Sequence, residues 1–115
     1  MSITVTIPDW RPAGLNQIMR GKLRDRIRFG KRDKRMVWAY FNGQPKATGK
    51  RKVSMHIVLT GREKPYDPDN AWKSVLDALK ACGQLVDDSH RHCELGAITY
   101  DRALKGSTTI TLEDV

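Results

Sequence analysis

The sequence predicts an α/β (α+β) fold: one small domain in which helices flank a mixed sheet, with elements in the order β-α-β-α-β-β. Residues 3–7 and 53–59 alternate apolar and polar side chains with the period of two of a half-buried strand. Two other segments, around 31–41 and 67–81, carry apolar side chains at helical spacing, and two more strand-like runs follow them. The length of 115 residues fits a single domain over 1–115, without an internal repeat or linker.

The first half of the chain contains one strand and one clear helix. The alternation over residues 3–7 stops at Pro8, which ends the strand. The helix is expected after Gly30. Its apolar face has i, i+1, i+4, i+5 spacing and consists of Met36, Val37, Tyr40 and Phe41. Gly21 and Gly30 predict a loop or a broken helix over residues 15–30.

The second half contains the clearest helix of the sequence. The strand at 53–59 precedes it and is expected to be central, because Val58 adds an apolar side chain to its outer face. Asp67 is the expected N-cap of the helix and Pro68 its first residue, while Gly83 ends it. Its stripe at i, i+3, i+4, i+7 spacing consists of Trp72, Val75, Leu76 and Leu79. The last expected elements are two strands and the hairpin loop between them, at residues 94–100, 108–112 and 102–106.

The charge of the chain, +8 in total, is divided unevenly. Residues 1–60 hold 14 Lys or Arg and 3 Asp or Glu, whereas residues 61–115 hold 7 and 10. A basic surface attracts phosphate groups through counterion release. Carboxylates repel the same groups, so an acidic cluster in such a protein needs a reason of its own, and a bound divalent cation supplies one.

The sequence also bears on location and on the cysteines. No apolar run approaches the roughly 20 residues of a membrane span, and the first ten residues lack the basic start and apolar core of a signal peptide. We therefore expect a cytoplasmic protein with no membrane association, in which Cys82 and Cys93 are free thiols. A zinc site of His90, His92 and Cys93 with Cys82 is the rival metal hypothesis, but its spacing fits no standard zinc pattern.

Nine basic side chains stand between residues 20 and 35, with only two acids among them. They are Arg20, Lys22, Arg24, Arg26, Arg28, Lys31, Arg32, Lys34 and Arg35. So many charges with so little compensation predict a surface that holds DNA phosphates, and the alternative is a merely solvated helix face. Tyr66, in the loop before Asp67, is the aromatic side chain best placed to touch a base, whereas Trp72 belongs to the core.

Carboxylates and a lysine gather around the start of the second helix. Asp67 and Asp69 are expected at the N-terminus of this helix, where the partial positive charge of the helix dipole keeps carboxylates ionised. Ionised oxygen ligands are what Mg²⁺ requires. Lys73 follows Asp69 by one helical turn, and the pair Asp87-Asp88 follows the helix. In the simpler alternative, Asp67 is only an N-cap and Asp69 only a favourable acid of the first turn, while Lys73 and Asp77 are a solvated i, i+4 pair and Asp87-Asp88 are turn residues.

The stretch from Asp67 to Asp88 resembles the RusA family of Holliday junction resolvases. That family shows D-x-D-N at a helix start, a lysine four residues later, D-A-L within the helix, a glycine and an acidic pair. In this sequence these are Asp67-Pro68-Asp69-Asn70, Lys73, Asp77-Ala78-Leu79, Gly83 and Asp87-Asp88. The resemblance covers about 22 residues. The polar run after the acidic pair departs from the family's usual step into a strand.

The resemblance implies a function and a site. Asp67, Asp69 and Asp88 would bind Mg²⁺ or Mn²⁺, and Lys73 would be the essential lysine. The protein would be a homodimer from a bacterial or prophage setting, nicking four-way DNA junctions symmetrically in recombination and repair. Two other classes remain: a non-catalytic nucleic-acid-binding protein of the same fold, and a basic assembly protein that does not respond to divalent ions.

Overall fold

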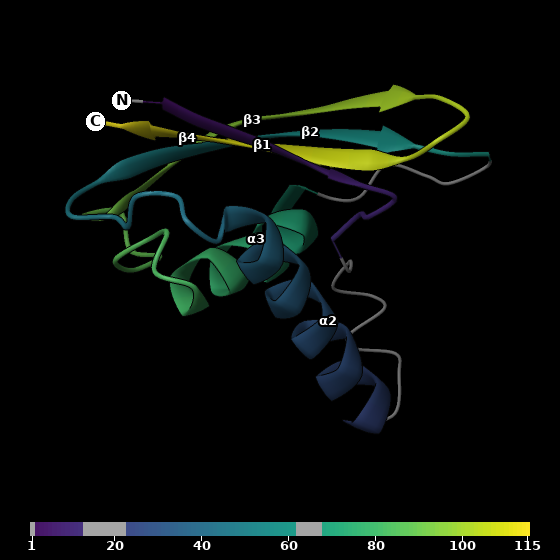
Figure 1. Cartoon of the computed structure of the whole chain (residues 1–115), viewed down its shortest axis with the longest axis horizontal. Coiled ribbons are helices and arrows are strands. Elements are labelled where there is room, and N and C mark those ends of the chain that lie inside the picture. The colour runs from purple at the N-terminus through teal and green to yellow at the C-terminus, as the bar shows by residue number, and fades with distance from the viewer. Residues whose placement is uncertain (1, 13–22, 62–67) are drawn as a thin grey trace.

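The computed structural model describes residues 2–12, 23–61 and 68–115, with the backbone alone for 23–30 and 68–71. Its elements follow one another in the predicted order β-α-β-α-β-β, which confirms the mixed α+β class (Figure 1). They are β1 (Ser2–Pro8), α2 (Leu23–Phe41), β2 (Arg51–Leu59), α3 (Pro68–Ala81), β3 (Cys93–Arg102) and β4 (Ser107–Asp114). Among the described residues, no helix has the length and apolar content needed to cross a membrane.

The four strands form one mixed sheet in the order β1-β4-β2-β3. β4 pairs antiparallel with β1 and with β2, whereas β3 pairs parallel with β2. β2 therefore lies inside the sheet, as the sequence predicts. Among the described strands, β1 and β3 are the two edges.

The predicted hairpin between the last two strands is wrong, because β2 lies between β3 and β4. Residues 103–106 cross the end of β2 instead, and the Ala103 amide donates a hydrogen bond to the Leu59 carbonyl at 3.0 Å. The crossing covers two strand spacings of about 4.8 Å each, which four residues can span. An interior position suits β4 because its Ile110 and Leu112 side chains are fully buried.

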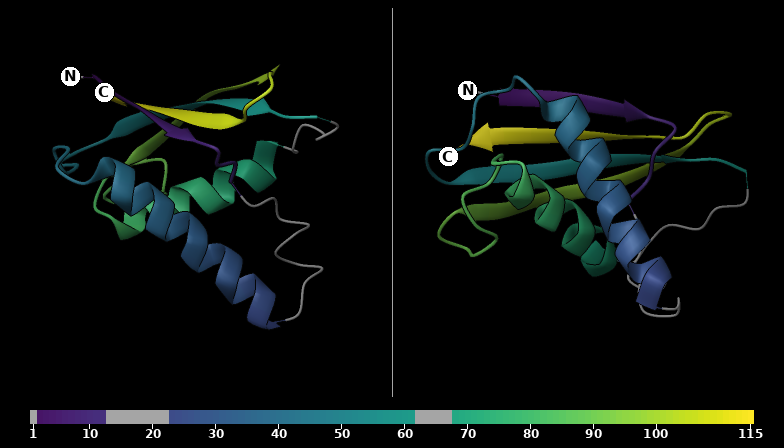
Figure 2. Two further views of the ribbon diagram at one scale, coloured as in Figure 1. Left: turned by 45° about the vertical axis from the view of Figure 1, so that its right-hand side comes forward. Right: turned by 60° about the horizontal axis from the view of Figure 1, so that its bottom comes forward.

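Both helices pack on the same face of the sheet, so the domain has two layers (Figures 1 and 2). No described element covers the opposite face. Threonine hydroxyls pair there across β1 and β4, with 2.9 Å between the Oγ1 atoms of Thr6 and Thr109 and 3.4 Å between those of Thr4 and Thr111. The alternation of each strand thus separates an apolar face under the helices from a polar face in solvent.

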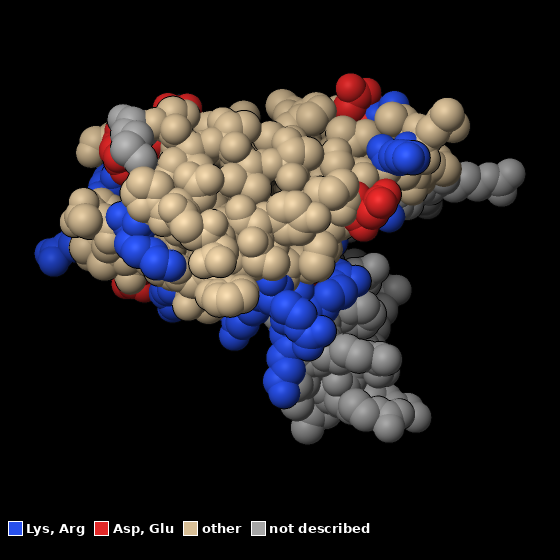
Figure 3. All heavy atoms as spheres, in the orientation of Figure 1, with Lys and Arg blue, Asp and Glu red and all other residues tan. Residues whose placement is uncertain are grey.

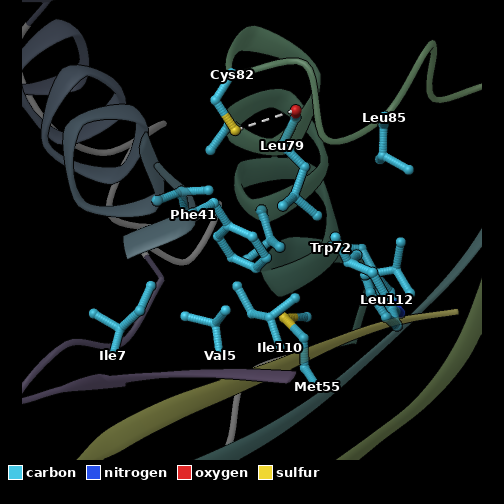
Figure 4. Packing of buried hydrophobic residues seen from close by; sticks show 14 of the residues in the cluster. Val5, Ile7, Phe41, Met55, Trp72, Leu79, Cys82, Leu85, Ile110 and Leu112 are labelled. Atoms are coloured by element: carbon cyan, nitrogen blue, oxygen red, sulfur yellow. Dashed lines mark hydrogen bonds between the residues drawn. The ribbon is translucent and has the colours of Figure 1, made fainter. Parts of the chain in front are cut away.

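The core lies between the sheet and the two helices (Figure 4). Its labelled members are Val5, Ile7, Phe41, Met55, Trp72, Leu79, Cys82, Leu85, Ile110 and Leu112. Trp72, expected in the core, is 7% exposed. Of the apolar face predicted for α2, Val37 and Phe41 are buried, but Tyr40 remains 41% exposed.

Helix α2 begins at Leu23 and runs unbroken through Gly30, so the expected loop or broken helix before Gly30 is wrong for residues 23–30. A glycine inside a helix costs about 1 kcal/mol relative to alanine. That cost is small beside the packing of the rest of α2, where Val37 and Phe41 are buried and Asp33 is held by hydrogen bonds. Tertiary contacts therefore outweigh the local preference. Gly21 lies outside the described residues.

Candidate active site on helix α3

Helix α3 begins at Pro68, which confirms the helix start expected at Asp67-Pro68. Proline suits this position because its missing N–H is one that a helix leaves without a partner. Asp67 itself and the side chain of Asp69 lie outside the described residues. What the structure gives is the place of Asp69, in the first turn of α3, where the helix dipole favours a carboxylate.

Lys73 and Asp77 lie further along the same helix. The Lys73 side chain is exposed and Asp77 is half-buried. None of the ion pairs among the described residues joins Lys73 to Asp77. The simpler alternative, in which these two side chains form an i, i+4 pair, therefore has no ion pair to support it. The Lys73 ammonium thus stands in solvent near the first turn of α3.

Asp33 fixes the position of α3 against α2. Its carboxylate is 1% exposed and accepts hydrogen bonds from the Trp10 indole Nε1 at 3.1 Å and from the Ser74 hydroxyl. Arg32 Nη2 donates at 3.1 Å to Asp33 Oδ1, the oxygen that also accepts from Trp10, whereas Ser74 donates to Oδ2. Residues from the segment after β1, from α2 and from α3 thus meet on one carboxylate.

The sequence interpretation missed this role and counted Asp33 only as an acid in a basic run. A signal was present, because Asp33, Val37 and Phe41 follow one another at i, i+4, i+8. That spacing puts Asp33 on the buried stripe of the helix. A charge on an apolar stripe indicates a buried carboxylate with partners rather than a solvated one.

The predicted DNA-binding residues fall into three groups. Lys31, Lys34 and Arg35 are exposed on α2, and Figure 3 shows Lys and Arg side chains gathered where this helix leaves the body of the protein. Arg32 is held to Asp33 and, through Nη2, to the Arg11 carbonyl oxygen at 3.4 Å, so it also has a structural role. The backbone of α2 carries Arg24, Arg26 and Arg28, while Arg20, Lys22 and Tyr66 lie outside the described residues.

The acidic pair lies at the other end of α3. The Lys80 ammonium, in the last turn, is 3.8 Å from the Asp87 carboxylate. The Asp88 backbone N–H donates to Asp87 Oδ1 at 2.9 Å, and this hydrogen bond is the main reason why the pKa of Asp87 is lowered. Asp88 itself is exposed.

Arg51, at the start of β2, anchors the segment that holds the acidic pair. Its buried guanidinium donates from Nη1 to the Gln84 carbonyl at 3.1 Å and from Nε to Asp114 at 3.0 Å. The Arg51 amide also donates to the His92 carbonyl at 3.1 Å. Residues 82–92 are therefore held at the amino end of β2 (Figures 1 and 2).

Asp69 belongs to the first turn of α3, whereas the acidic pair lies by the last turn, where the Lys80 ammonium is 3.8 Å from the Asp87 carboxylate. β2 and β3 are parallel, so the residue that precedes β3 and the residues that follow β2 lie at opposite ends of these strands. The nine residues of β2 put about 26 Å between the two ends. The convergence of the three aspartates thus stays a prediction, and within one chain the described elements give it no support.

The rival zinc cluster is not formed either. Cys82 and Cys93 are buried free thiols, and burial raises the pKa of both. In the described part of the chain, which includes His90, His92 and both cysteines, no three His, Cys, Asp or Glu side chains are grouped so that they could hold a metal. Both cysteines instead pack in the apolar core.

Comparison with known proteins adds no relative. No protein-family model matches the chain, and no curated protein matches it significantly. The sequence and the geometry of the site therefore carry the functional argument.

Proposed function

We propose that this protein is a metal-dependent endonuclease that nicks four-way DNA junctions and acts as a homodimer. One observation supports it most. The hydrogen bond from Ser74 to Asp33 joins the turn of α3 that holds Lys73 to the turn of α2 that holds Lys31. Cations that bind a phosphate backbone thus lie next to the helix that carries the Asp69 carboxylate.

The metal ligands proposed are Asp67, Asp69 and Asp88. Their carboxylate oxygens are the hard donors that Mg²⁺ prefers, and Mn²⁺ accepts the same set. When bound, such an ion polarises a phosphoryl oxygen and activates water. Lys73 has a separate task in this proposal. Its exposed ammonium holds the scissile phosphate and offsets the negative charge that grows on it in the transition state.

A second copy of the chain supplies the third carboxylate in this proposal. β3 is an edge strand, and Leu95, on its helix side, is 52% exposed. Antiparallel pairing of two β3 strands about a two-fold axis places the start of one β3 beside the end of the other. In this arrangement Asp88 of the partner subunit comes to the end of the strands where α3 begins.

A mixed dimer tests this arrangement. Asp69→Asn and Asp88→Asn chains are co-expressed with different affinity tags, and the heterodimer is purified and incubated with a synthetic four-way junction and Mg²⁺. Each homodimer is expected to be inactive. In the heterodimer one site carries both substitutions and the other carries none, so it should nick one strand at about half the wild-type rate.

The same assay separates the remaining hypotheses. If each site lay within one chain, every site of the heterodimer would lack one ligand, and nicking would stay at the level of the homodimers. A wild-type protein that binds the junction but does not nick it with Mg²⁺ or Mn²⁺ would be a non-catalytic nucleic-acid-binding protein. A basic assembly protein would show neither junction binding nor a response to divalent ions.

A further inference from the structure

Trp38 is the exception among the three tryptophans. Trp10 and Trp72 are 4% and 7% exposed, whereas the Trp38 side chain is 56% exposed on α2. One exposed aromatic residue on a surface needs no explanation by itself. The surroundings of Trp38 are what make it informative.

The Trp38 indole lines a hollow between α2 and the carboxyl end of α3, with a volume of about 270 Å³. Its other lining residues are Lys34, Arg35, Ala81 and Cys82. Across from the indole, the wall consists of a small side chain and a buried thiol, so the space beside the ring is open and apolar. This volume is just below the range of pockets for drug-sized ligands and suits one planar ring system.

Two cations stand at the rim of the hollow on the Trp38 side. Lys34 and Arg35 precede Trp38 by four and three residues, so all three share one face of α2. Neither cation has an ion pair with a described residue, in contrast to Arg32, which is bound to Asp33. The Cys82 carbonyl oxygen accepts a hydrogen bond at 2.8 Å from the ammonium of Lys46, which is not among the lining residues.

We propose that this hollow binds one unstacked nucleotide of a DNA strand, with its base against the Trp38 indole and its phosphate beside Lys34 and Arg35. Aromatic faces accept bases of any sequence, and neighbouring cations hold the backbone. The inference rests on the proposed function in that it takes DNA as the ligand. The hollow lies at the end of α3 away from Lys73, so it is a binding subsite separate from the proposed nicking site.

Charge favours a nucleotide over a second copy of the chain as the occupant. None of the described residues that line the hollow is acidic. Docking another copy of a chain with a net charge of +8 would bring like charges together at Lys34 and Arg35, whereas a phosphate neutralises them.

Tryptophan fluorescence tests the proposal, because Trp38 is the one tryptophan of the three that a solvent-borne ligand can reach. Oligo(dT) is titrated into the full-length protein without divalent ions, so that no cleavage occurs. We expect quenching of the Trp38 emission. Trp38→Phe should abolish the quenching and keep the affinity, since phenylalanine still stacks, whereas Trp38→Leu should weaken binding by roughly tenfold or more.

Two further variants complete the design. Tyr40→Leu is the matched control: an exposed aromatic residue on the same helix that does not line the hollow, and its removal should leave affinity and quenching unchanged. Replacing both Lys34 and Arg35 by Gln should lower the slope of log affinity against log salt by about 0.7 for each charge removed.

The proposal is overturned if oligo(dT) fails to bind, if it binds without quenching Trp38, or if Trp38→Leu binds as tightly as the wild type. Self-association that Trp38→Leu abolishes, without an effect on oligo(dT) binding, would make the hollow a protein interface instead. Failure of the proposed nuclease function looks different: oligo(dT) would still quench Trp38, but the wild type would not nick a junction with Mg²⁺ or Mn²⁺.

Discussion

The Lys80 ammonium lies 3.8 Å from the Asp87 carboxylate, so the last turn of α3 holds its lysine in an ion pair with the segment that follows. Lys73, seven residues earlier, has no ion pair with a described residue. The helix therefore carries two exposed lysines in different settings. Lys80 stabilises the carboxyl end of a helix, where a cation is favourable. Lys73 lies near the amino end, where the helix dipole disfavours a cation, so it does not stabilise the helix in the way that Lys80 does.

This contrast gives the first prediction. Lys73→Ala should fold, dimerise and bind junction DNA, but it should nick at least roughly 100-fold more slowly, because a contact to the developing charge is lost. Lys80→Ala, the matched control on the same helix, should nick at nearly the wild-type rate. Single-turnover kinetics at saturating protein and Mg²⁺ give the comparison, since they remove binding and product release from it. Similar rates for both variants would make Lys73 an ordinary surface residue.

Asp33 carries the second prediction. Asp33→Ala leaves the Trp10 indole N–H and the Ser74 hydroxyl without their buried acceptor, so we expect the free energy of unfolding to fall by about 3 kcal/mol. Asp33→Asn keeps one acceptor oxygen and should lose less. Urea denaturation measures both. The half-buried Asp77 on α3 provides the control, because its replacement by Ala should cost well under 1 kcal/mol. Equal losses at the two positions would contradict the assigned role of Asp33.

Much of the fold could be predicted from local pattern. The alternation at 3–7 and 53–59 and the Trp72 stripe each report one element, because the period of apolar residues reflects how that element meets the core. The strand order could not be predicted in this way. Whether β4 pairs with β3 or enters between β1 and β2 depends on contacts over the whole chain, and a short connection can serve both arrangements.

The site shows the same division. A capping residue and proline located the amino end of α3, since both signals depend on neighbours in sequence. The position of Asp88 far from the amino end of α3 follows from the parallel pairing of β2 and β3. The sequence did not predict this pairing, because β3 was expected to form a hairpin with the last strand. The burial of Arg51 could not be predicted from the sequence, because a basic residue at the start of a strand is normally expected to be exposed. It is buried because its guanidinium donates hydrogen bonds to Gln84 and Asp114, which come from distant parts of the chain.

The buried thiols give a third prediction, on pH. Burial raises the pKa of Cys82 and of Cys93, and the nearby Asp88 carboxylate raises that of Cys93 further. The folded state thus keeps both thiols protonated at a pH where the unfolded chain has begun to ionise them. Their contribution to stability is complete below the unfolded pKa of about 8.5 and is lost as the pH rises through the folded pKa.

Urea denaturation from about pH 7 to pH 10 measures this effect by difference. The wild type should lose stability above about pH 8.5 more steeply than a variant with Cys82→Ala and Cys93→Ala, because the lysines and tyrosines that titrate in the same range are common to both. Parallel curves for the two proteins would show that the thiols do not contribute.

The last prediction concerns the edge strand β3. Leu95 is 52% exposed on the side of the strand that faces the helices, where Ile98 and Tyr100 are only partly buried. In a dimer paired through β3, a carboxylate at this position would be buried between the two β3 strands and would lose its hydration without gaining a partner. Leu95→Glu should therefore produce a monomer. If the metal site needs Asp88 of the partner subunit, this variant should also lose nicking while it keeps its fold. Leu104→Glu is the matched control. Leu104 is fully exposed in the connection between β3 and β4, so a glutamate there stays hydrated and should leave the dimer unchanged. Sedimentation and a junction-nicking assay, run on the same preparations, give the answer. A Leu95→Glu monomer that nicks both strands at the wild-type rate would show that one chain holds a complete site, and an unchanged dimer would show that the two copies meet elsewhere.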